Sequence, residues 1–259
     1  MVMVLGGAKM ILEHYSGPKN RTMDLSLLEK YGSDFLDTVE NMKTKFFRAD
    51  ATWQVDGVDN PYRRYWEYWW MIEHGLILNP FAKILDAGCG FAIFQFLLLE
   101  IYANIRVVGV DSGKFCPDFL YRVADISHKL GYKGRYGATF NDLCSLEFPD
   151  RTFDNVFCVS VIEHITEDEQ VIQELLRVLK RGGTLGLTFD FHKDSFPDRK
   201  DRLYMIKDIN RILDAASRMD GHLMYNDFVD LTDWNNPPVN LSDKLDHKYN
   251  FGALFISRR

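Results

Sequence analysis

Small and acidic residues recur where stretches predicted to be β-strands come to an end. The run Asp86-Ala87-Gly88-Cys89-Gly90 closes the first such stretch, and its two glycines permit a sharp turn that a ligand can approach closely. A helix expected directly after the turn would direct its N-terminal N–H groups to the same place, where they favour an anion. The chemistry indicated is the binding of a ligand that carries a carboxylate or a phosphate.

The spacing of small residues in this turn discriminates between ligands. A dinucleotide fingerprint that begins at Gly88 requires glycine at position 93, where the chain has Ile93. A related spacing, with a small residue two positions after the second glycine, is met by Ala92. The turn therefore fits a dinucleotide pyrophosphate less well than another anionic ligand.

Two further acids follow the next two predicted strands. Asp111 can accept hydrogen bonds from both hydroxyls of a ribose, and Asp142 is suited to the exocyclic amine of an adenine. Leu143 adds a backbone N–H and an apolar wall. Because ligands of open α/β sheets bind at the carboxyl ends of the strands, we expect these groups to bind one nucleoside.

Strands and helices alternate from residue 82 onward. The predicted strands are AKILDAG, RVVGVD, GRYGATF, FDNVFCVS and GTLGLTFDF. Helices are predicted from Phe91 to Ala103, from Pro117 to a stop at Gly131, from a capping box of Thr166 and Glu169 to a stop at Gly182, and over Arg202–Arg218. This alternation implies parallel pairing with right-handed crossovers, and hence an open α/β sheet covered by helices.

Both ends of the chain are less regular. Residues 22–47 predict two amphipathic helices broken at Gly32. The segment PYRRYWEYWWMIEHG places aromatic rings three to four residues apart on one helical face: Tyr62, Trp66, Trp69 and Trp70. A buried core helix is favoured there over an acceptor-binding lid, because such stripes usually pack. After Met219 only NFGALFISR predicts a strand, which could join the sheet in antiparallel orientation.

The composition is that of a folded, acidic protein. With 31 Lys and Arg against 37 Asp and Glu, the 259 residues carry a net charge of −6, which argues against nucleic acid as a partner. No apolar stretch reaches the roughly 18 residues of a membrane span, since Gln95 and Glu100 interrupt the best candidate. The first residues lack the features of a secretory signal, and the four cysteines form no CxxC pair. A cytoplasmic location is therefore expected.

Four motifs in order resemble the class I S-adenosylmethionine-dependent methyltransferases, in particular the group related to ubiquinone and menaquinone biosynthesis. They are ILDAGCGFA, VVGVDSG, NDLCSLEFPDRTFDNVFCVSVIEHI and ELLRVLKRGGTLGLTF. The resemblance implies a doubly wound, mostly parallel seven-stranded sheet with an antiparallel C-terminal strand. It also implies a cofactor-binding domain at 82–259, and the cofactor S-adenosylmethionine with S-adenosylhomocysteine as product. Residues 1–81 match no motif of this family and are expected to form a helical extension or lid.

The same resemblance assigns ligand contacts by position. Asp86, Gly88, Cys89, Gly90 and Ala92 would surround the methionine moiety. Asp111 and Ser112 would lie at the ribose, Asp142 and Leu143 at the adenine, and Ser160 would face the methyl-transfer channel.

Glu163 and His164 follow the fourth strand, where the acceptor atom should lie. His164 is the candidate general base, since imidazole titrates near neutral pH; the alternative is that it only bonds the loop or lines the pocket. No metal is expected, because Ser160 stands where a related metal-binding run has its first Glu. Asp190, His192 and Asp194 are interpreted as a polar loop rather than a metal or acid–base site.

These observations predict methyl transfer to a small-molecule acceptor, with O-methylation preferred on the strength of His164. Sugar, polyketide-like and quinone acceptors are all compatible with the sequence. Two alternatives stay open: a nicotinamide-dependent oxidoreductase, against which Ile93 and Asp142 argue, and a methyltransferase-like module that binds the cofactor without turnover.

Overall fold

The structure, a computed structural model, describes residues 37–39, 41–42, 44–45, 61–75, 79–90, 93–114, 117–191, 204–229 and 250–259. A seven-stranded sheet runs through them in the order β3-β2-β1-β4-β5-β7-β6. The strands are β1 Lys83–Ala87, β2 Arg106–Asp111, β3 Tyr136–Phe140, β4 Phe153–Val159, β5 Leu179–Phe191, β6 Gly221–Val229 and β7 Asn250–Arg258. β1 to β5 pair in parallel, and β7 is antiparallel to β5 and β6. The predicted fold is confirmed.

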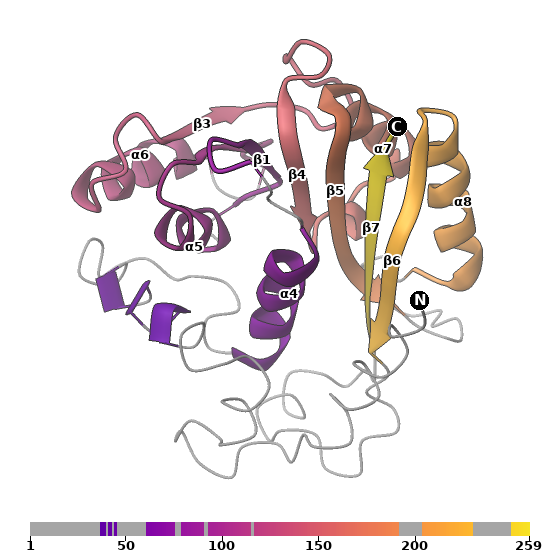
Figure 1. Ribbon diagram of the computed structural model, residues 1–259, viewed down its shortest axis with the longest axis horizontal. Coiled ribbons are helices and arrows are strands. Elements are labelled where there is room, and N and C mark those ends of the chain that lie inside the picture. Colours follow the sequence, from indigo (N-terminus) through magenta and orange to yellow (C-terminus); the bar gives the residue numbers. More distant parts are fainter. Residues whose placement is uncertain are drawn as a thin grey trace, which may run out of the picture.

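Helices cover both faces of this sheet (Figure 1). α4 Pro61–His74, α5 Phe94–Ile101 and α6 Phe119–Lys129 share one apolar core with one set of strand residues, whereas α7 Asp168–Val178 and α8 Ile206–Ser217 share a second core with the other set. Successive strand residues supply opposite cores, as Phe157 and Cys158 do in β4. The pleat of the strands therefore explains why both faces are apolar.

The aromatic helix α4 is part of the first core. Trp70 is 2% exposed and stacks on Phe255 of β7 with ring centroids 4.9 Å apart, and Tyr68 stacks on Phe94 of α5 at 5.1 Å. Trp69 is half-buried, and the side chains of Tyr62 and Trp66 lie outside the described part. The core-helix interpretation is confirmed for the described rings.

The prediction of where α7 ends is wrong. The helix ends at Val178 rather than at Gly182, and β5 begins at the next residue. Arg258, the last residue of β7, donates hydrogen bonds to the carbonyl oxygens of Leu176, Arg177 and Leu179 at 2.7, 2.9 and 2.7 Å. The guanidinium thus satisfies carbonyl groups that would otherwise be left to water where no glycine stop follows the helix.

The capping box at the start of α7 is also absent from the structure. Glu167 is the residue that precedes the helix, and no side chain caps it. Instead the fully buried Asp168 accepts hydrogen bonds from Arg211 of α8 and from the Tyr204 hydroxyl. A helix-to-helix ion pair therefore takes the place of the local cap that Thr166 and Glu169 were expected to form.

The tail contains one strand more than its local sequence pattern predicted. β7 matches the expected final strand, whereas β6 falls in the segment that the sequence pattern left unassigned. Of the expected helices before residue 48, residues 37–39, 41–42 and 44–45 are helical, and Val39 and Met42 are fully buried. The remaining residues of that prediction lie outside the described residues.

Candidate active site

The site follows from the order of the strands. That order runs from β1 outward to β3 on one side and from β4 outward on the other, so the carboxyl ends of β1 and β4 flank the switch point where ligands of such sheets bind. Gly88 follows β1 with φ +73°, and a Cβ there would lie 2.5 Å from both γ-methyl groups of Val161, which follows β4. The two loops therefore touch, and only glycine fits at their contact.

The glycine turn is tied to the end of β2. The backbone N–H groups of Gly88 and Cys89 donate to the Val110 carbonyl oxygen at 2.8 and 2.9 Å. Asp111 Oδ2 accepts from the Gly90 N–H at 3.1 Å, and its Oδ1 accepts from the Gly113 N–H at 2.9 Å. The half-buried carboxylate is held in one orientation, and each oxygen keeps a further lone pair that a ribose hydroxyl can use.

Asp86 is a buried acid at the end of β1. It is 2% exposed, and its Oδ2 has no hydrogen-bond partner among the described residues. Burial, followed by repulsion from the nearby Asp111 carboxylate, raises the pKa of Asp86 to about 7. A buried acceptor of this kind, close to the switch point, is a group that a donor from a ligand can satisfy.

Cys89 packs beneath the turn rather than toward the crevice. Its side chain is 3% exposed and belongs to the core that α5 shares, and burial raises the pKa of the thiol well above its usual range. The Tyr136 hydroxyl donates to Gln95 Oε1 at 2.6 Å, and a Cβ on Gly109 would meet Gln95, Cys89 and Tyr136 within 2.8 Å. The sequence did not predict a role for Gln95 and Tyr136, which pack next to Cys89 on the core side of the turn.

The segment after β3 carries the expected adenine contacts. Asp142 is exposed and its Oδ1 accepts from the Cys144 N–H at 2.9 Å, whereas Leu143 is 6% exposed. The Asn141 N–H donates to the Asp111 carbonyl oxygen at 3.0 Å, which joins this segment to the expected ribose site. The exposed Ser112 accepts from the Lys114 N–H at 3.3 Å, beside the same edge.

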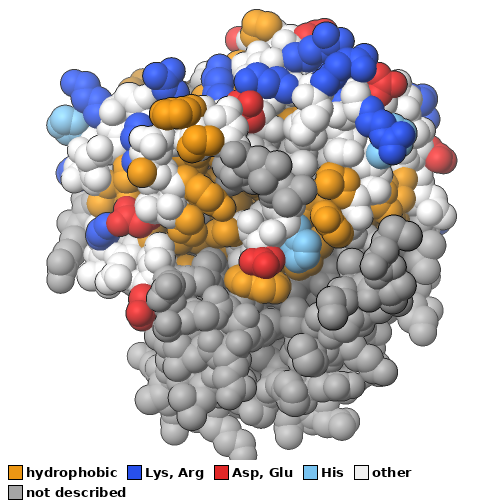
Figure 2. Space-filling model, in the orientation of Figure 1, with side chains coloured by type: hydrophobic (Ala, Val, Ile, Leu, Met, Phe, Trp, Pro, Cys, Tyr) orange, Lys and Arg blue, Asp and Glu red, His pale blue; other side chains and the backbone are white. Residues whose placement is uncertain are grey.

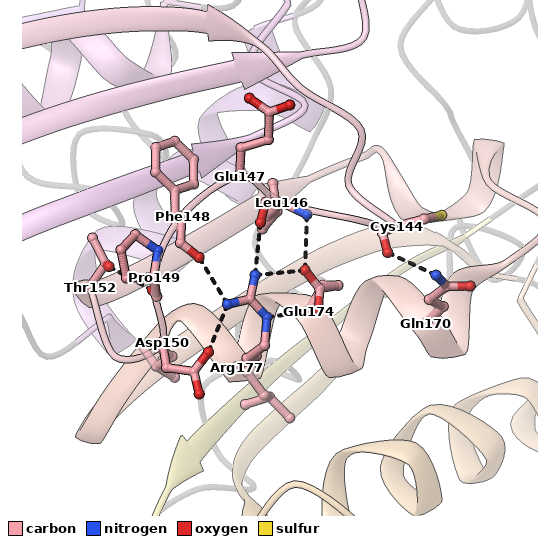
Figure 3. Close-up of polar contacts among 12 residues, drawn as sticks. Cys144, Leu146, Glu147, Phe148, Pro149, Asp150, Thr152, Gln170, Glu174 and Arg177 are labelled. Atoms are coloured by element: carbon pink, nitrogen blue, oxygen red, sulfur yellow. Dashed lines mark hydrogen bonds and ion pairs between the residues drawn. The ribbon is translucent and has the colours of Figure 1, made fainter.

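Three residues of α7 hold this segment in place (Figure 3). Arg177 donates to the carbonyl oxygens of Leu146 and Phe148, both at 2.8 Å, and pairs with both oxygens of Glu174. Glu174 accepts in turn from the Leu146 N–H at 2.9 Å, and Gln170 donates to the Cys144 carbonyl oxygen at 2.8 Å. The hydrogen bond from Arg177 lowers the pKa of Glu174. Sequence reasoning assigned none of these three residues a role at the site.

The three predicted site residues after β4 lie in different environments. Ser160 is buried and has φ +51°, and its hydroxyl donates to Glu67 of α4. Glu163 is 2% exposed and its Oε1 accepts from the Asp190 N–H at 3.3 Å. His164, the last residue of the short 3-10 helix η1 Ile162–His164, is exposed. Glu163 therefore faces the fold and His164 faces outward, although the two are adjacent in sequence.

The structure brings together Asp86, Gly88, Gly90, Asp111 and Ser160 around the switch crevice. Ala92, His192 and Asp194 lie outside the described residues. Within the described ranges, no group of three His, Cys, Asp or Glu side chains could hold a metal ion, and no helix is long and apolar enough to cross a membrane. Lys and Arg side chains gather along the upper rim in Figure 2, at the end where β4 begins.

Comparison with known sequences agrees with this geometry. Residues 85–187 match the family model described as methyltransferase domain. A sterol 24-C-methyltransferase of Aspergillus fumigatus is 30% identical over 120 residues, which are 45% of this chain and 30% of that protein. A phosphoethanolamine N-methyltransferase of Arabidopsis thaliana is 30% identical over 113 residues, which are 44% of this chain and 22% of that protein. The chain thus spans less than a third of either relative.

Solved structures share the fold at low identity. The cyclase SpnF superimposes with a TM-score of 0.62 at 18% identity, over 87% of this chain and 94% of that one. A geranyl diphosphate C-methyltransferase from Streptomyces coelicolor, solved with S-adenosylhomocysteine, gives 0.59 at 12%, over 77% and 84%. The sheet order and the glycine turn agree with the match of residues 85–187 to a methyltransferase domain, and the solved structures show the fold alone. The matches do not single out the ubiquinone-related group of methyltransferases.

Proposed function

We propose that this chain transfers the methyl group of S-adenosylmethionine to a small-molecule acceptor and releases S-adenosylhomocysteine. The observation that carries the proposal is the Asp111 carboxylate, which two backbone N–H groups fix beside the glycine turn at the switch point. The buried Asp86 Oδ2, without a partner among the described residues, fits the α-amino group of the methionine moiety. Leu143 would pack against the adenine and Asp142 would accept from its amine.

Methyl transfer requires mainly that the protein bind the donor and the acceptor in the correct relative orientation. S-adenosylmethionine supplies a methyl group on a positively charged sulfur, and an acceptor displaces it in line. The residues at the crevice bind and orient the donor, and the contact between Gly88 and Val161 closes one wall of the site against water. Neither a metal ion nor a covalent enzyme intermediate is required for such a displacement.

The acceptor site is proposed to lie between the ends of β4 and β5 and the elements before residue 82. α4 reaches this edge through Glu67, and the exposed His164 could take a proton from an acceptor hydroxyl. O-methylation is proposed on that basis. The relatives are a sterol 24-C-methyltransferase and a phosphoethanolamine N-methyltransferase, so carbon and nitrogen acceptors belong in the same test.

The test measures binding and turnover separately. Calorimetry with S-adenosylhomocysteine should show a dissociation constant in the micromolar range, and incubation of S-adenosylmethionine with oxygen, nitrogen and carbon acceptors should release S-adenosylhomocysteine. Absence of binding would refute the proposal. Binding without product from any acceptor would favour a different reaction on the same fold, for which the cyclase SpnF gives a precedent in fold alone.

The role of His164 has its own control. His164→Ala should lower turnover of a hydroxyl acceptor at least tenfold, whereas His128→Ala, an exposed histidine on α6, should leave it unchanged. Equal rates for wild type and His164→Ala would remove the argument for a histidine base and, with it, the preference for oxygen.

A further inference from the structure

Glu67 is a carboxylate in the middle of the aromatic helix α4, and it is fully buried. Its Oε1 accepts hydrogen bonds from Ser160 Oγ at 2.5 Å and from Thr188 Oγ1 at 3.0 Å. These two hydroxyls come from the carboxyl ends of β4 and β5. A buried carboxylate is costly unless hydrogen bonds stabilise it, and a charge-assisted bond is stronger than a neutral one. The three side chains therefore form one polar unit at the edge of the sheet where the site lies.

Ser160 has an unusual backbone within this unit. Its φ of +51° lies in the left-handed region, which residues other than glycine seldom adopt without support from their surroundings. Its N–H donates to the Thr188 carbonyl oxygen at 3.0 Å and to Thr188 Oγ1 at 3.1 Å. Glu67 Oε1 accepts from both hydroxyls, so one oxygen bonds the Ser160 side chain directly. The same oxygen bonds Thr188, which in turn accepts from the Ser160 backbone N–H.

The conformation of Ser160 determines where the loop after β4 goes. Val161 is the next residue, and its methyl groups meet the Gly88 turn at the switch point. Glu163 and His164 follow within η1. A change of φ at Ser160 would therefore move the wall of the crevice and the candidate acceptor-side residues together.

We propose that Glu67 is a positioning residue for methyl transfer. It holds Ser160 in the left-handed conformation, and through Ser160 it sets the position of the loop after β4 relative to the glycine turn. The inference rests on the proposed function, because the loop matters for turnover only if the crevice binds the methyl donor. It also connects α4, which precedes the methyltransferase domain in sequence, to the place of the reaction.

Substitutions in the full chain test this proposal by turnover with an accepted substrate. Glu67→Gln keeps the shape but replaces one carboxyl oxygen with an NH₂ group that cannot accept a hydrogen bond, and we expect at least a tenfold lower kcat with S-adenosylhomocysteine affinity within threefold of wild type. Glu67→Gln combined with Ser160→Gly should be at least threefold faster than Glu67→Gln alone, because glycine adopts φ +51° without being held. The exposed Glu73, on the same helix, supplies the control Glu73→Gln, which should match wild type.

Three outcomes would overturn the proposal. An unchanged kcat in Glu67→Gln would show that the buried carboxyl group has no influence on the reaction. If ligand affinity and melting temperature fall together with kcat in Glu67→Gln, the contact is purely structural. A double variant as slow as Glu67→Gln would show that the conformation of Ser160 is not what Glu67 controls.

A measurement that needs no acceptor separates this inference from the proposed function. Hydrogen exchange of the Ser160 amide, resolved by NMR, should be at least tenfold faster in Glu67→Gln than in wild type, while the amides of β1 and β2 keep their protection. If the wild type fails to bind S-adenosylhomocysteine, the proposed function is wrong. If amide exchange at Ser160 is unchanged in Glu67→Gln, Glu67 does not stabilise the conformation of Ser160, whatever the outcome for the proposed function.

Discussion

The backbone N–H of Gly90 donates a hydrogen bond to Asp111 Oδ2 at 3.1 Å and so joins the turn after β1 to the end of β2. The second oxygen of the same carboxylate accepts from the Gly113 N–H at 2.9 Å. One side chain therefore organises two loops and still presents lone pairs to the crevice. This arrangement makes Asp111 the most direct test of ligand binding.

Asp111→Asn should weaken S-adenosylhomocysteine binding by roughly 10- to 100-fold, since hydrogen bonds to a charged acceptor contribute about 1.5–3 kcal/mol. Its amide offers a single acceptor oxygen in place of two. Calorimetry measures the change. Asp125→Asn is the matched control, because Asp125 is 56% exposed and pairs only with Lys129 on α6 among the described residues; it should bind as wild type does. Equal affinities for Asp111→Asn and wild type would contradict the assignment.

The raised pKa of Asp86 predicts how stability depends on pH. The native pKa of about 7 exceeds the ordinary value of 3.8, so the native state binds a proton that the unfolded state has lost between these values. Stability from this group is complete below about pH 4 and is lost as the pH rises through 7, by about 4 kcal/mol at most. Urea unfolding of the ligand-free protein from pH 5 to 8 should therefore show a smaller decline for Asp86→Asn than for wild type.

Ligand binding should depend on the same proton. An ammonium group next to Asp86 favours the carboxylate, so S-adenosylhomocysteine should bind more tightly as the pH rises from 6 to 8 and should release a proton at pH 6.5. Calorimetry in two buffers with different ionisation enthalpies measures that proton. Asp86→Asn should bind weakly and without proton release. A proton release that persists in this variant would assign the effect to another group.

Gly88→Ala and Gly131→Ala separate backbone strain from crowding. Both glycines have a positive φ, +73° and +79°, but only a Cβ at Gly88 meets other atoms, at 2.5 Å from the Val161 methyl groups. Gly131→Ala should cost about 1 kcal/mol of folding free energy, and Gly88→Ala about 1–3 kcal/mol more together with loss of S-adenosylhomocysteine binding.

A second substitution provides the check on this comparison. Val161→Ala removes the two methyl groups, so the double variant with Gly88→Ala should recover a part of both the stability and the affinity. If the double variant is no better than Gly88→Ala, contact with Val161 is not the reason for glycine at this position.

Arg177→Met should loosen the loop that carries the expected adenine contacts. It leaves two carbonyl oxygens and the Glu174 carboxylate without the guanidinium, so we expect a loss of about 2–3 kcal/mol in urea unfolding and weaker S-adenosylhomocysteine binding. Arg181→Met, which among the described residues loses an exposed 3.5 Å pair with Asp220, should change stability by less than about 0.5 kcal/mol. Similar losses in the two variants would argue against a special role of Arg177.

Features that depend on neighbouring residues could be predicted from the sequence. The apolar runs before Gly88 and Asp111 indicate strands, because a strand that is buried on both faces is apolar along most of its length. The glycines after the first run indicate a turn, because glycine adopts a positive φ without strain. Alternation with helices then implies a parallel sheet, whose carboxyl ends bring the marked residues to one edge. Asp86, Gly88, Gly90 and Asp111 therefore meet as the sequence indicates.

Contacts between distant segments were decided by the tertiary structure alone. Glu67 and Ser160 are 93 residues apart, and a carboxylate on an aromatic helix carries no sign of which strand end it will reach. The guanidinium of Arg258 ends α7 from 79 to 82 residues away, in place of the local glycine stop that the pattern favoured. Local sequence specifies which conformations a segment can adopt. Which side chains then meet across the sheet depends on how α4, α7 and β7 pack on it, and that is settled only when the whole core forms.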